Sequence, residues 1–331
     1  MQKYEYKVSV IIPVHNTKKY LKKCIDSLLG QSIGSIEVIV VDDASTEDIL
    51  AFLNDEYGAK ENLIYLRNEK ALKPGGARNR GMDIAKGKFI GYCDSDDWVD
   101  LSLYEQVVNS MEENNADIGM VSMVREYDTL QNNPYFKCKY TQLNILSGDM
   151  ALRILSHQYN MGIEIVPACI NKIYRNSFLK ESKSKFEENM YFQGILFSVY
   201  TFLRAKRIVC VPDVNYRHYL RVQSITQSFD IQHIKDFEKC FKKIKKYFVE
   251  TNQYERYTLN YYKLCEHYLN VVVSEIFEYV QDEDMKKKYL QQTLGVLRHL
   301  VDVDEYFEYT TAEEIRQHIQ PLLRNHFEML R

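Results

Sequence analysis

The sequence lacks several features that mark membrane-spanning, secreted or nucleic-acid-binding chains. No apolar run approaches the roughly 20 residues that a membrane-spanning helix needs. The start, "MQKYEYKVSVIIPVHN", has no basic segment followed by an apolar one, as a signal peptide would. The formal net charge is only −3, so no strong field draws the chain to nucleic acid. We therefore expect a cytoplasmic protein with no nucleic-acid partner.

Paired cysteines are lacking as well, because the cysteines are scattered, odd in number, and no two of them form a Cys-x-x-Cys pair. Most of them flank apolar residues, which indicates small buried side chains in a reducing compartment rather than disulfides or zinc ligands. The chain has 331 residues, 45% of them hydrophobic and 27% charged. Such a composition is that of a globular protein with one large domain or two smaller ones. The seven cysteines are Cys24, Cys93, Cys138, Cys169, Cys210, Cys240 and Cys265.

Strand and helix patterns alternate through the first half of the chain. Apolar β-rich runs at 8–14, 36–45, 62–68 and 88–100 predict buried strands. Between them, 16–31 has one apolar helical face that ends near Gly30, and 74–87 reads as a glycine loop entering a helix. The alternation predicts an α/β fold, with a doubly wound, mostly parallel sheet flanked by helices. Ligands of such sheets bind beyond the carboxyl ends of the strands.

Two later segments depart from this alternation. Residues 127–147 are polar, aromatic and aperiodic, and we expect an excursion or flap there. From about 230 onward the chain shows three or four charged amphipathic helices. We therefore expect a sheet-containing domain over 1–230 and a C-terminal helical region over 231–331.

Carboxylates gather where two of the predicted strands end. Asp94 and Asp96 leave one strand at positions i and i+2, where both can bind one hard cation through oxygen. The structural alternative for this pair is a solvated turn that caps the next helix. Asp42 and Asp43 follow another strand. We expect Asp43 to accept hydrogen bonds from a nucleobase or ribose, and Asp42 to have the structural role.

The stretch "KPGGARNRG" brings two glycines and several cations to the same edge of the predicted sheet. Gly75 and Gly76 permit close backbone approach, and Lys73, Arg78 and Arg80 suit a diphosphate. The stretch is neither a Gly-x-Gly-x-x-Gly motif nor a Walker A loop. Beside the Asp-x-Asp pair, it favours a site for a nucleoside diphosphate.

Together these residues resemble glycosyltransferase family 2, whose members have the GT-A fold. The matching blocks cover about residues 7–228 in the family's order and spacing: "VSVIIPVHN", "LLGQSIGSIEVIVVDDAST", "PGGARNRGMDIAKGKFIGYCDSDDWV", "NKIYR" and "YRHYLRVQSIT". The C-terminal third has no usable signature. A nucleotidyltransferase, which would share the sheet and the metal, lacks support because "PVHNTKKY" stands where its glycine-rich loop would follow the first strand.

The resemblance implies an inverting glycosyltransferase that depends on Mg²⁺ or Mn²⁺. The implied donor is a nucleotide-sugar, expected to be a UDP-sugar, and the implied acceptor is a glycan or lipid-linked molecule of a bacterial polysaccharide or glycoconjugate. Asp94, Asp96 and His218 are the implied metal ligands, with Asp96 the more direct and catalytic one. The alternative for His218 is a structural role. The residues implied to bind the donor are Pro13, Asp43, Gly76, Arg78, Asp94 and Arg221.

One family feature is missing, namely the Glu-Asp pair whose aspartate takes the proton of the acceptor. In the preferred alignment Gln193-Gly194 occupies that place, and in the other alignment Glu188-Asn189 does. Neither puts an aspartate at the base position, and neither glutamine nor glycine is a base. Three explanations stay open: a substitute carboxylate, with Glu188 and then Glu187 one to two helical turns upstream; an acceptor that ionises by itself; or a catalytically weak subunit that binds donor.

The C-terminal helices raise two further hypotheses. Segment 234–250 has an apolar face and a lysine-rich remainder, so it fits either a bundle helix with solvated lysines or a helix lying on anionic lipid. The second reading predicts a peripheral position on the inner face of the membrane. Segment 254–280 is longer and aromatic, which suits helix packing or a homodimer.

Overall fold

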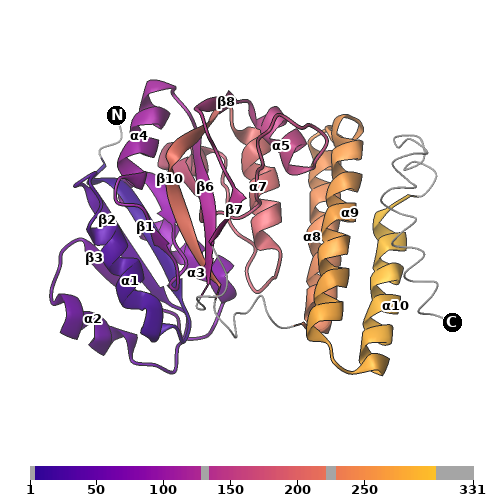
Figure 1. Ribbon diagram of the computed structural model, residues 1–331, viewed down its shortest axis with the longest axis horizontal. Coiled ribbons are helices and arrows are strands. Elements are labelled where there is room, and N and C mark those ends of the chain that lie inside the picture. The colour runs from indigo at the N-terminus through magenta and orange to yellow at the C-terminus, as the bar shows by residue number, and fades with distance from the viewer. Residues whose placement is uncertain (1–3, 128–133, 221–228, 303–331) are drawn as a thin grey trace. The chain divides into compact units, whose positions relative to one another are not determined.

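The computed structural model describes residues 4–127, 134–220 and 229–302 (Figure 1). The chain divides into two compact units. One unit comprises Met1–Leu152 and Gly162–Arg221, and the other comprises Arg153–Met161 and Val222–Arg331. The first contains the sheet, and the described part of the second is mostly helical.

Ten strands of the described chain form one sheet in the first unit. The main path runs in the order β3-β2-β1-β4-β9-β6-β10-β5, with β7 beside β6 and β8 beside β10. The strands are β1 (Tyr6–Val14), β2 (Ile36–Asp42), β3 (Leu63–Arg67), β4 (Gly87–Tyr92), β5 (Trp98–Val99), β6 (Ile118–Tyr127), β7 (Tyr135–Cys138), β8 (Asn144–Leu146), β9 (Lys172–Arg175) and β10 (Ile208–Leu220).

The sheet has a parallel half and a mixed half. Strands β3, β2, β1 and β4 are parallel, as the sequence predicts for buried runs joined by helices. Strand β9 then runs antiparallel to both β4 and β6, and β10 is parallel to β6 and antiparallel to β5. The predicted α/β architecture with flanking helices is confirmed, and its parallel character is concentrated in the first half.

Helices connect and cover these strands. In the first unit α3 packs on β1 and β2, α1 on β2 and β5, and α4 on β6 and β10. Leu21, Cys24, Ile25 and Leu28 form the buried face of α1, which follows the predicted pattern. The helices are α1 (Lys18–Leu29), α2 (Ile49–Tyr57), α3 (Lys73–Ile84), α4 (Leu103–Glu113), α5 (Gly148–Leu155), α6 (Asn176–Glu181) and α7 (Gln193–Arg204).

Two predictions about local structure are wrong. Segment 127–147 contains β7 and β8, of four and three residues, which are too short to give a readable alternation. Residues 128–133 lie outside the described residues. The glycines of "KPGGARNRG" lie inside α3 rather than in a loop before it, because Pro74 at its start favours helical backbone.

Strand β10 has one irregularity that matters for the site. Its pairing with β6 shifts between Val211 and Asn215, so Val211 faces Val121 whereas Asn215 faces the next residue, Ser122. Residues 212–214 are therefore extra residues on β10. Beyond them the strand continues to Leu220 beside β6.

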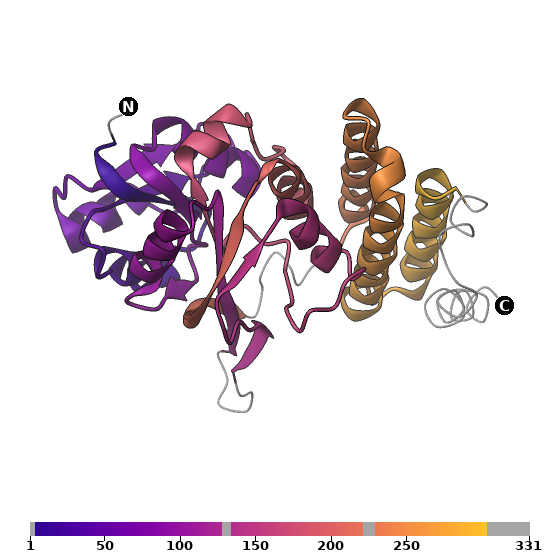
Figure 2. The ribbon, with the colours of Figure 1, turned by 90° about the horizontal axis from the view of Figure 1, so that it is seen from above.

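In the second unit α8 (Ile231–Glu250), α9 (Tyr254–Tyr279) and α10 (Glu283–Leu300) pack against one another (Figures 1 and 2). Asp230 caps α8 by accepting hydrogen bonds from the backbone N–H groups of Gln232 and His233. The predicted apolar face of α8 is buried, and it consists of Ile234, Phe237, Phe241, Ile244 and Phe248. Among the described residues, no helix has the length and apolarity that crossing a membrane requires. The homodimer stays a prediction.

Candidate active site

The carboxyl ends of three parallel strands meet at one edge of the sheet. Val14 of β1 lies opposite Asp42 of β2, and the backbone N–H of Asp43 donates to the Val14 carbonyl at 2.7 Å. On the other side of β1, the N–H of Cys93 donates to the Ile11 carbonyl at 3.1 Å. Asp43 and Asp94, which the sequence assigns to separate strand ends, therefore belong to one edge.

Asp42 and Asp43 have different surroundings. Asp42 is fully buried, forms an ion pair with Arg67 and accepts hydrogen bonds from Tyr65 and the backbone of Ser45 at 2.9 and 2.8 Å. Asp42 therefore stabilises the end of β2. Pro13, the residue before Val14, is buried within β1.

Asp43 is oriented toward the segment that precedes α3. One of its oxygens, Oδ1, accepts hydrogen bonds from Asn68 Nδ2 at 2.6 Å and from the Leu72 N–H at 2.9 Å. These bonds tie the end of β2 to the start of α3 and fix the carboxylate. A fixed carboxylate at a strand end can accept an N–H or O–H from a ligand.

The first turn of α3 lies against the segment that leads into α7. A Cβ on Gly75 would collide with the Gln193 side chain and the Glu187 carbonyl, so only glycine permits this approach. Asn79 and the backbone of Phe186 exchange two hydrogen bonds, each of 2.9 Å. Gly76 is also enclosed, because a Cβ there would meet the Leu72 side chain. In this structure, the Gln193 side chain and the Glu187 carbonyl occupy the space beside Gly75.

The loop after β4 carries Asp94, Asp96 and Asp97 and is called the acidic loop below. Arg78 Nη2 donates to Asp94 Oδ1 at 2.6 Å, and the Arg78 side chain is only 8% exposed. Tyr216 of β10 accepts from the Asp94 N–H at 3.0 Å and donates to Asp97 at 2.5 Å. Burial, followed by the proximity of Asp94 and Asp96, raises the pKa of Asp97 well above its usual value. Asp97 therefore connects the acidic loop to β10.

His218 lies near this loop, at the end of β10. Its Nδ1 is buried and has no hydrogen-bond partner among the described residues. Burial and the positive charge of Arg125 lower the pKa of His218 to about 4, with Asp94 acting in the opposite direction. The imidazole is therefore neutral near pH 7. Arg221 lies outside the described residues.

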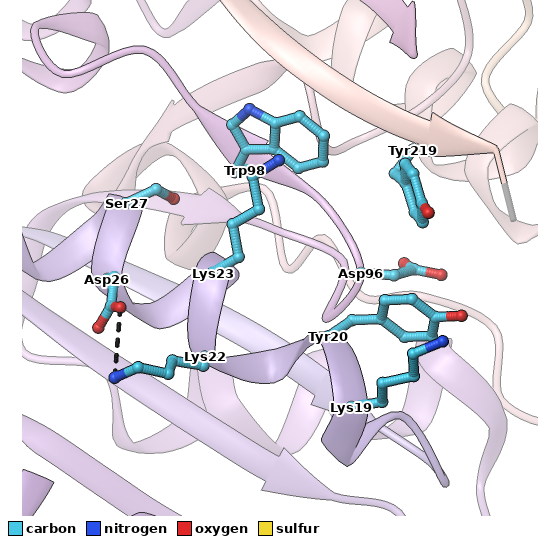
Figure 3. Close-up of a pocket in the computed structure, with 9 residues that line it drawn as sticks. All are labelled: Lys19, Tyr20, Lys22, Lys23, Asp26, Ser27, Asp96, Trp98 and Tyr219. Carbon is cyan, nitrogen blue, oxygen red and sulfur yellow. Dashed lines mark ion pairs between the residues drawn. The ribbon is translucent and has the colours of Figure 1, made fainter. Parts of the chain in front are cut away.

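A cavity of about 660 Å³ lies beside Asp96 (Figure 3). Its aromatic lining is Tyr20, Trp98 and Tyr219, and its cations come from α1. In Figure 3 the Asp96 carboxylate lies between the rings of Tyr20 and Tyr219. The sequence reasoning missed this cavity because Tyr20 fits the apolar face of α1. The signal that could have found it is the run "KKYLKK", in which lysines flank an aromatic residue.

Gln193 and Gly194, which stand where the family has its Glu-Asp pair, lie within the described part of the chain. Helix α7 begins at Gln193, whose side-chain oxygen Oε1 is buried and has no hydrogen-bond partner among the described residues. A Cβ on Gly194 would lie 2.9 Å from the Pro167 carbonyl oxygen. Lys172 anchors the backbone on either side of Pro167, because it is fully buried and donates hydrogen bonds to the Val166 and Ala168 carbonyls at 2.6 Å each.

The sequence interpretation placed Glu187 and Glu188 along a helix, and this is wrong. Residues 183–192 have no helical structure, because α7 starts only at Gln193. Glu188 is exposed, and its neighbours contact α3: the Glu187 carbonyl lies at Gly75, and the Asn189 N–H donates to Leu72 at 3.2 Å. An exposed carboxylate is thus available close to the first turn of α3.

Among the described residues, no group of three or more His, Cys, Asp or Glu side chains is gathered as a ready metal-binding cluster. The acidic loop nevertheless offers the type of ligand that hard cations prefer, since Asp94 and Asp96 supply carboxylate oxygens. His218 adds a neutral imidazole near Asp94. These three residues are the ones that the sequence selects as metal ligands.

Comparison with known proteins gives concordant matches. The family model described as Glycosyl transferase family 2 matches residues 9–180. Glycosyltransferase GlyG of Streptococcus pneumoniae serotype 4 is 28% identical to the chain, over 71% of this chain and 78% of its own. Poly(ribitol-phosphate) beta-glucosyltransferase of Bacillus spizizenii is 27% identical, over 65% of this chain and only 32% of its own length.

A solved structure also matches. The crystal structure of S. aureus TarS 1–349 in complex with UDP-GlcNAc has a TM-score of 0.60 and 23% sequence identity. The match covers 95% of this chain and 79% of that chain. At this level of identity the likeness shows a shared fold.

Proposed function

The chain belongs to glycosyl transferase family 2, whose model matches just over half of it, and we propose that it transfers a sugar from a nucleotide-sugar to a glycan or lipid-linked acceptor. The observation that carries this proposal is the edge of the sheet where Asp43, Arg78 and Asp94 meet. A fixed carboxylate for the nucleoside and a buried cation beside the acidic loop suit a nucleoside diphosphate.

The proposed donor is a UDP-sugar. The TarS structure, which has a similar fold, holds UDP-GlcNAc, and this supports the choice of nucleotide. In this chain Asp43 would accept a hydrogen bond from the nucleoside, with Pro13 and Gly76 forming nearby backbone. Arg78 and, outside the described residues, Arg221 would lie near the diphosphate.

We further propose that the transferase uses Mg²⁺ or Mn²⁺. Asp94 and Asp96 would hold the cation, and His218 fits as a third ligand because its imidazole is neutral and its Nδ1 has no partner among the described residues. When bound, such a cation stabilises the negative charge that develops on the leaving nucleoside diphosphate. Arg78 would hold the Asp94 carboxylate in place through their ion pair.

The proposed reaction is a single displacement with inversion. The acceptor hydroxyl oxygen forms a bond to the anomeric carbon, the bond from that carbon to the diphosphate oxygen breaks, and its electron pair leaves with the diphosphate. The hydroxyl proton must go to a base. Glu188 is the proposed base, because it is exposed beside the first turn of α3 and Gln193-Gly194 offers no carboxylate.

A donor screen tests the proposal. Purified chain would be incubated with Mn²⁺ and a panel of UDP-, GDP-, CMP- and dTDP-sugars, and release of the nucleoside phosphate would be measured. We expect turnover of a UDP-sugar that Asp96→Ala abolishes. Donor binding by calorimetry without turnover, even with acceptors supplied, would instead favour a donor-binding or assembly subunit. If no donor binds, the transferase proposal is wrong.

The lysines of α8 bear on where the protein works. Lys235, Lys239, Lys242, Lys243 and Lys246 line a shallow hollow of about 290 Å³ together with Glu238. This surface supports the proposal of a peripheral contact with anionic lipid. Failure to pellet with anionic vesicles at physiological salt would count against it.

All seven cysteines, which lie within the described residues, are buried and form no disulfides, which suits a reducing, cytoplasmic setting.

A further inference from the structure

The cavity beside Asp96 is built from other elements than the proposed donor site. Its walls come from α1, from Trp98 of β5 and from Tyr219 of β10, whereas the donor residues belong to β1, β2, α3 and the end of β4. Asp96 lines the cavity and also belongs to the proposed metal site. The volume of about 660 Å³ lies within the range of about 300–1,000 Å³ that is usual for ligand pockets.

Two of the three lysines that line the cavity form no ion pair with the described residues. Lys22 is already paired with Asp26 and Glu56, at 3.5 and 2.7 Å. Lys19 and Lys23 lie one turn apart on α1, and within the described part of the chain neither has a carboxylate at ion-pair distance. Lys23 Nζ lies instead 2.9 Å from the centre of the Trp98 ring.

Aromatic rings form the other component of the cavity. Tyr219 contacts both of the other rings, with its ring centre 5.7 Å from that of Tyr20 and 5.9 Å from that of Trp98. Lys19 Nζ is 5.3 Å from the Tyr20 ring centre. Figure 3 shows Lys19 and Lys23 reaching along these rings, with Asp96 between Tyr20 and Tyr219. The cavity therefore combines aromatic faces with separate positive charges.

We propose that this cavity binds the acceptor, and that the acceptor is a chain of sugars or polyols joined by phosphodiesters. Lysine amines act as point charges for phosphate, and aromatic rings offer large, partly apolar faces to the carbon skeleton between phosphates. The inference rests on the proposed function, because an acceptor must reach the sugar held next to Asp94 and Asp96. The name of the Bacillus spizizenii relative, which specifies poly(ribitol-phosphate), agrees with this chemistry.

Trp98 provides a local reporter, since it lines the cavity and is the single tryptophan of the chain. We would titrate the full chain with a short synthetic ribitol-phosphate oligomer and, separately, with a neutral maltooligosaccharide of equal length, following Trp98 fluorescence. We expect the anionic oligomer to bind at least about tenfold more tightly than the neutral one. Its binding should weaken as NaCl is added. Lys19→Glu should weaken it by a further factor of roughly ten.

Lys18→Glu is the matched control, because Lys18 is an exposed lysine of the same helix that does not line the cavity. It should change the affinity far less than Lys19→Glu does. Equal affinities for the two oligomers, equal affinities of the wild type and Lys19→Glu, or no Trp98 response at millimolar oligomer would each overturn the assignment.

A calorimetric titration with UDP-sugars separates this inference from the function on which it rests. Donor binding without a Trp98 response to the ribitol-phosphate oligomer refutes the cavity assignment alone. Failure of every donor to bind refutes the proposed transferase itself.

Discussion

Replacing His218 by Phe should reduce the loss of stability that the first unit suffers between pH 7 and pH 5 by about 2 kcal/mol. The pKa of this histidine is about 4 in the folded chain and 6.5 for an unperturbed imidazole. Between these values the unfolded chain binds a proton that the folded chain does not, so folding loses free energy as the pH falls. The stabilisation is complete above pH 6.5, falls between pH 6.5 and 4, and is fully lost below pH 4.

The magnitude follows from the two pKa values. The interval from 6.5 to about 4 corresponds to about 3 kcal/mol at about 1.4 kcal/mol per pH unit. Most of this loss, about 2 kcal/mol, falls between pH 7 and pH 5. Phe keeps a ring of similar shape, and the loss of Nδ1 removes no hydrogen bond to the described residues.

The assay is urea unfolding followed by Trp98 fluorescence, in metal-free buffer so that ligand binding by His218 does not contribute. Trp98 lies in the first unit and is the chain's single tryptophan, so the signal reports that unit. The wild type should lose about 2 kcal/mol more than His218→Phe between pH 7 and pH 5. Between pH 7.5 and 8.5 the two should change in parallel. Parallel behaviour over the acidic range as well would refute the reasoning.

Three further predictions concern the site. Gly194→Ala should destabilise the chain by about 1–3 kcal/mol, because a Cβ there lies 2.9 Å from the Pro167 carbonyl; Gly295→Ala, in α10 with no atom within 4 Å, should stabilise by about 0.5–1 kcal/mol. Thermal unfolding followed by circular dichroism would test both variants. A shift of the melting temperature in the same direction for the two would contradict the prediction. Asp94→Ala should lower stability by about 3 kcal/mol in urea, since Arg78 is then left buried and unpaired; a change below about 1 kcal/mol would show that solvent reaches Arg78. Glu188→Gln should reduce kcat by at least about 100-fold while the donor still binds, and an unchanged kcat would exclude Glu188 as the base.

Much of the fold was predictable because the sequence pattern is dense in its first half. The buried runs of β1, β2 and β4 are continuous and bounded by turn residues, so periodicity and spacing place them within a few residues. The same pattern puts Asp43 and Asp94 at one edge, since parallel strands share the side on which they end. The role of Asp42 was also predictable, because a residue at the buried end of a strand needs local partners.

The rest of the site depends on contacts between residues far apart in the chain. No local pattern announces that Gln193 packs on Gly75, or that Tyr216 joins Asp94 to Asp97. The cavity beside Asp96 is also of this kind, because Trp98 and Tyr219 meet Tyr20 only after β5 pairs with β10. Sequence reasoning therefore found the residues on strand ends and missed those that tertiary packing brings to them.

The irregularity in β10 separates the length of the chain from the faces that its side chains occupy. Side chains alternate between the two faces of a strand, and the pairing of Asn215 with Ser122 places Tyr216 and His218 on one face and Arg217 and Tyr219 on the other. Because residues 212–214 are not paired with β6, this segment can take up a change in length while that pairing is kept. An alignment or graft of this region therefore has to preserve the pairing of 215–220 with β6 rather than the number of residues before it.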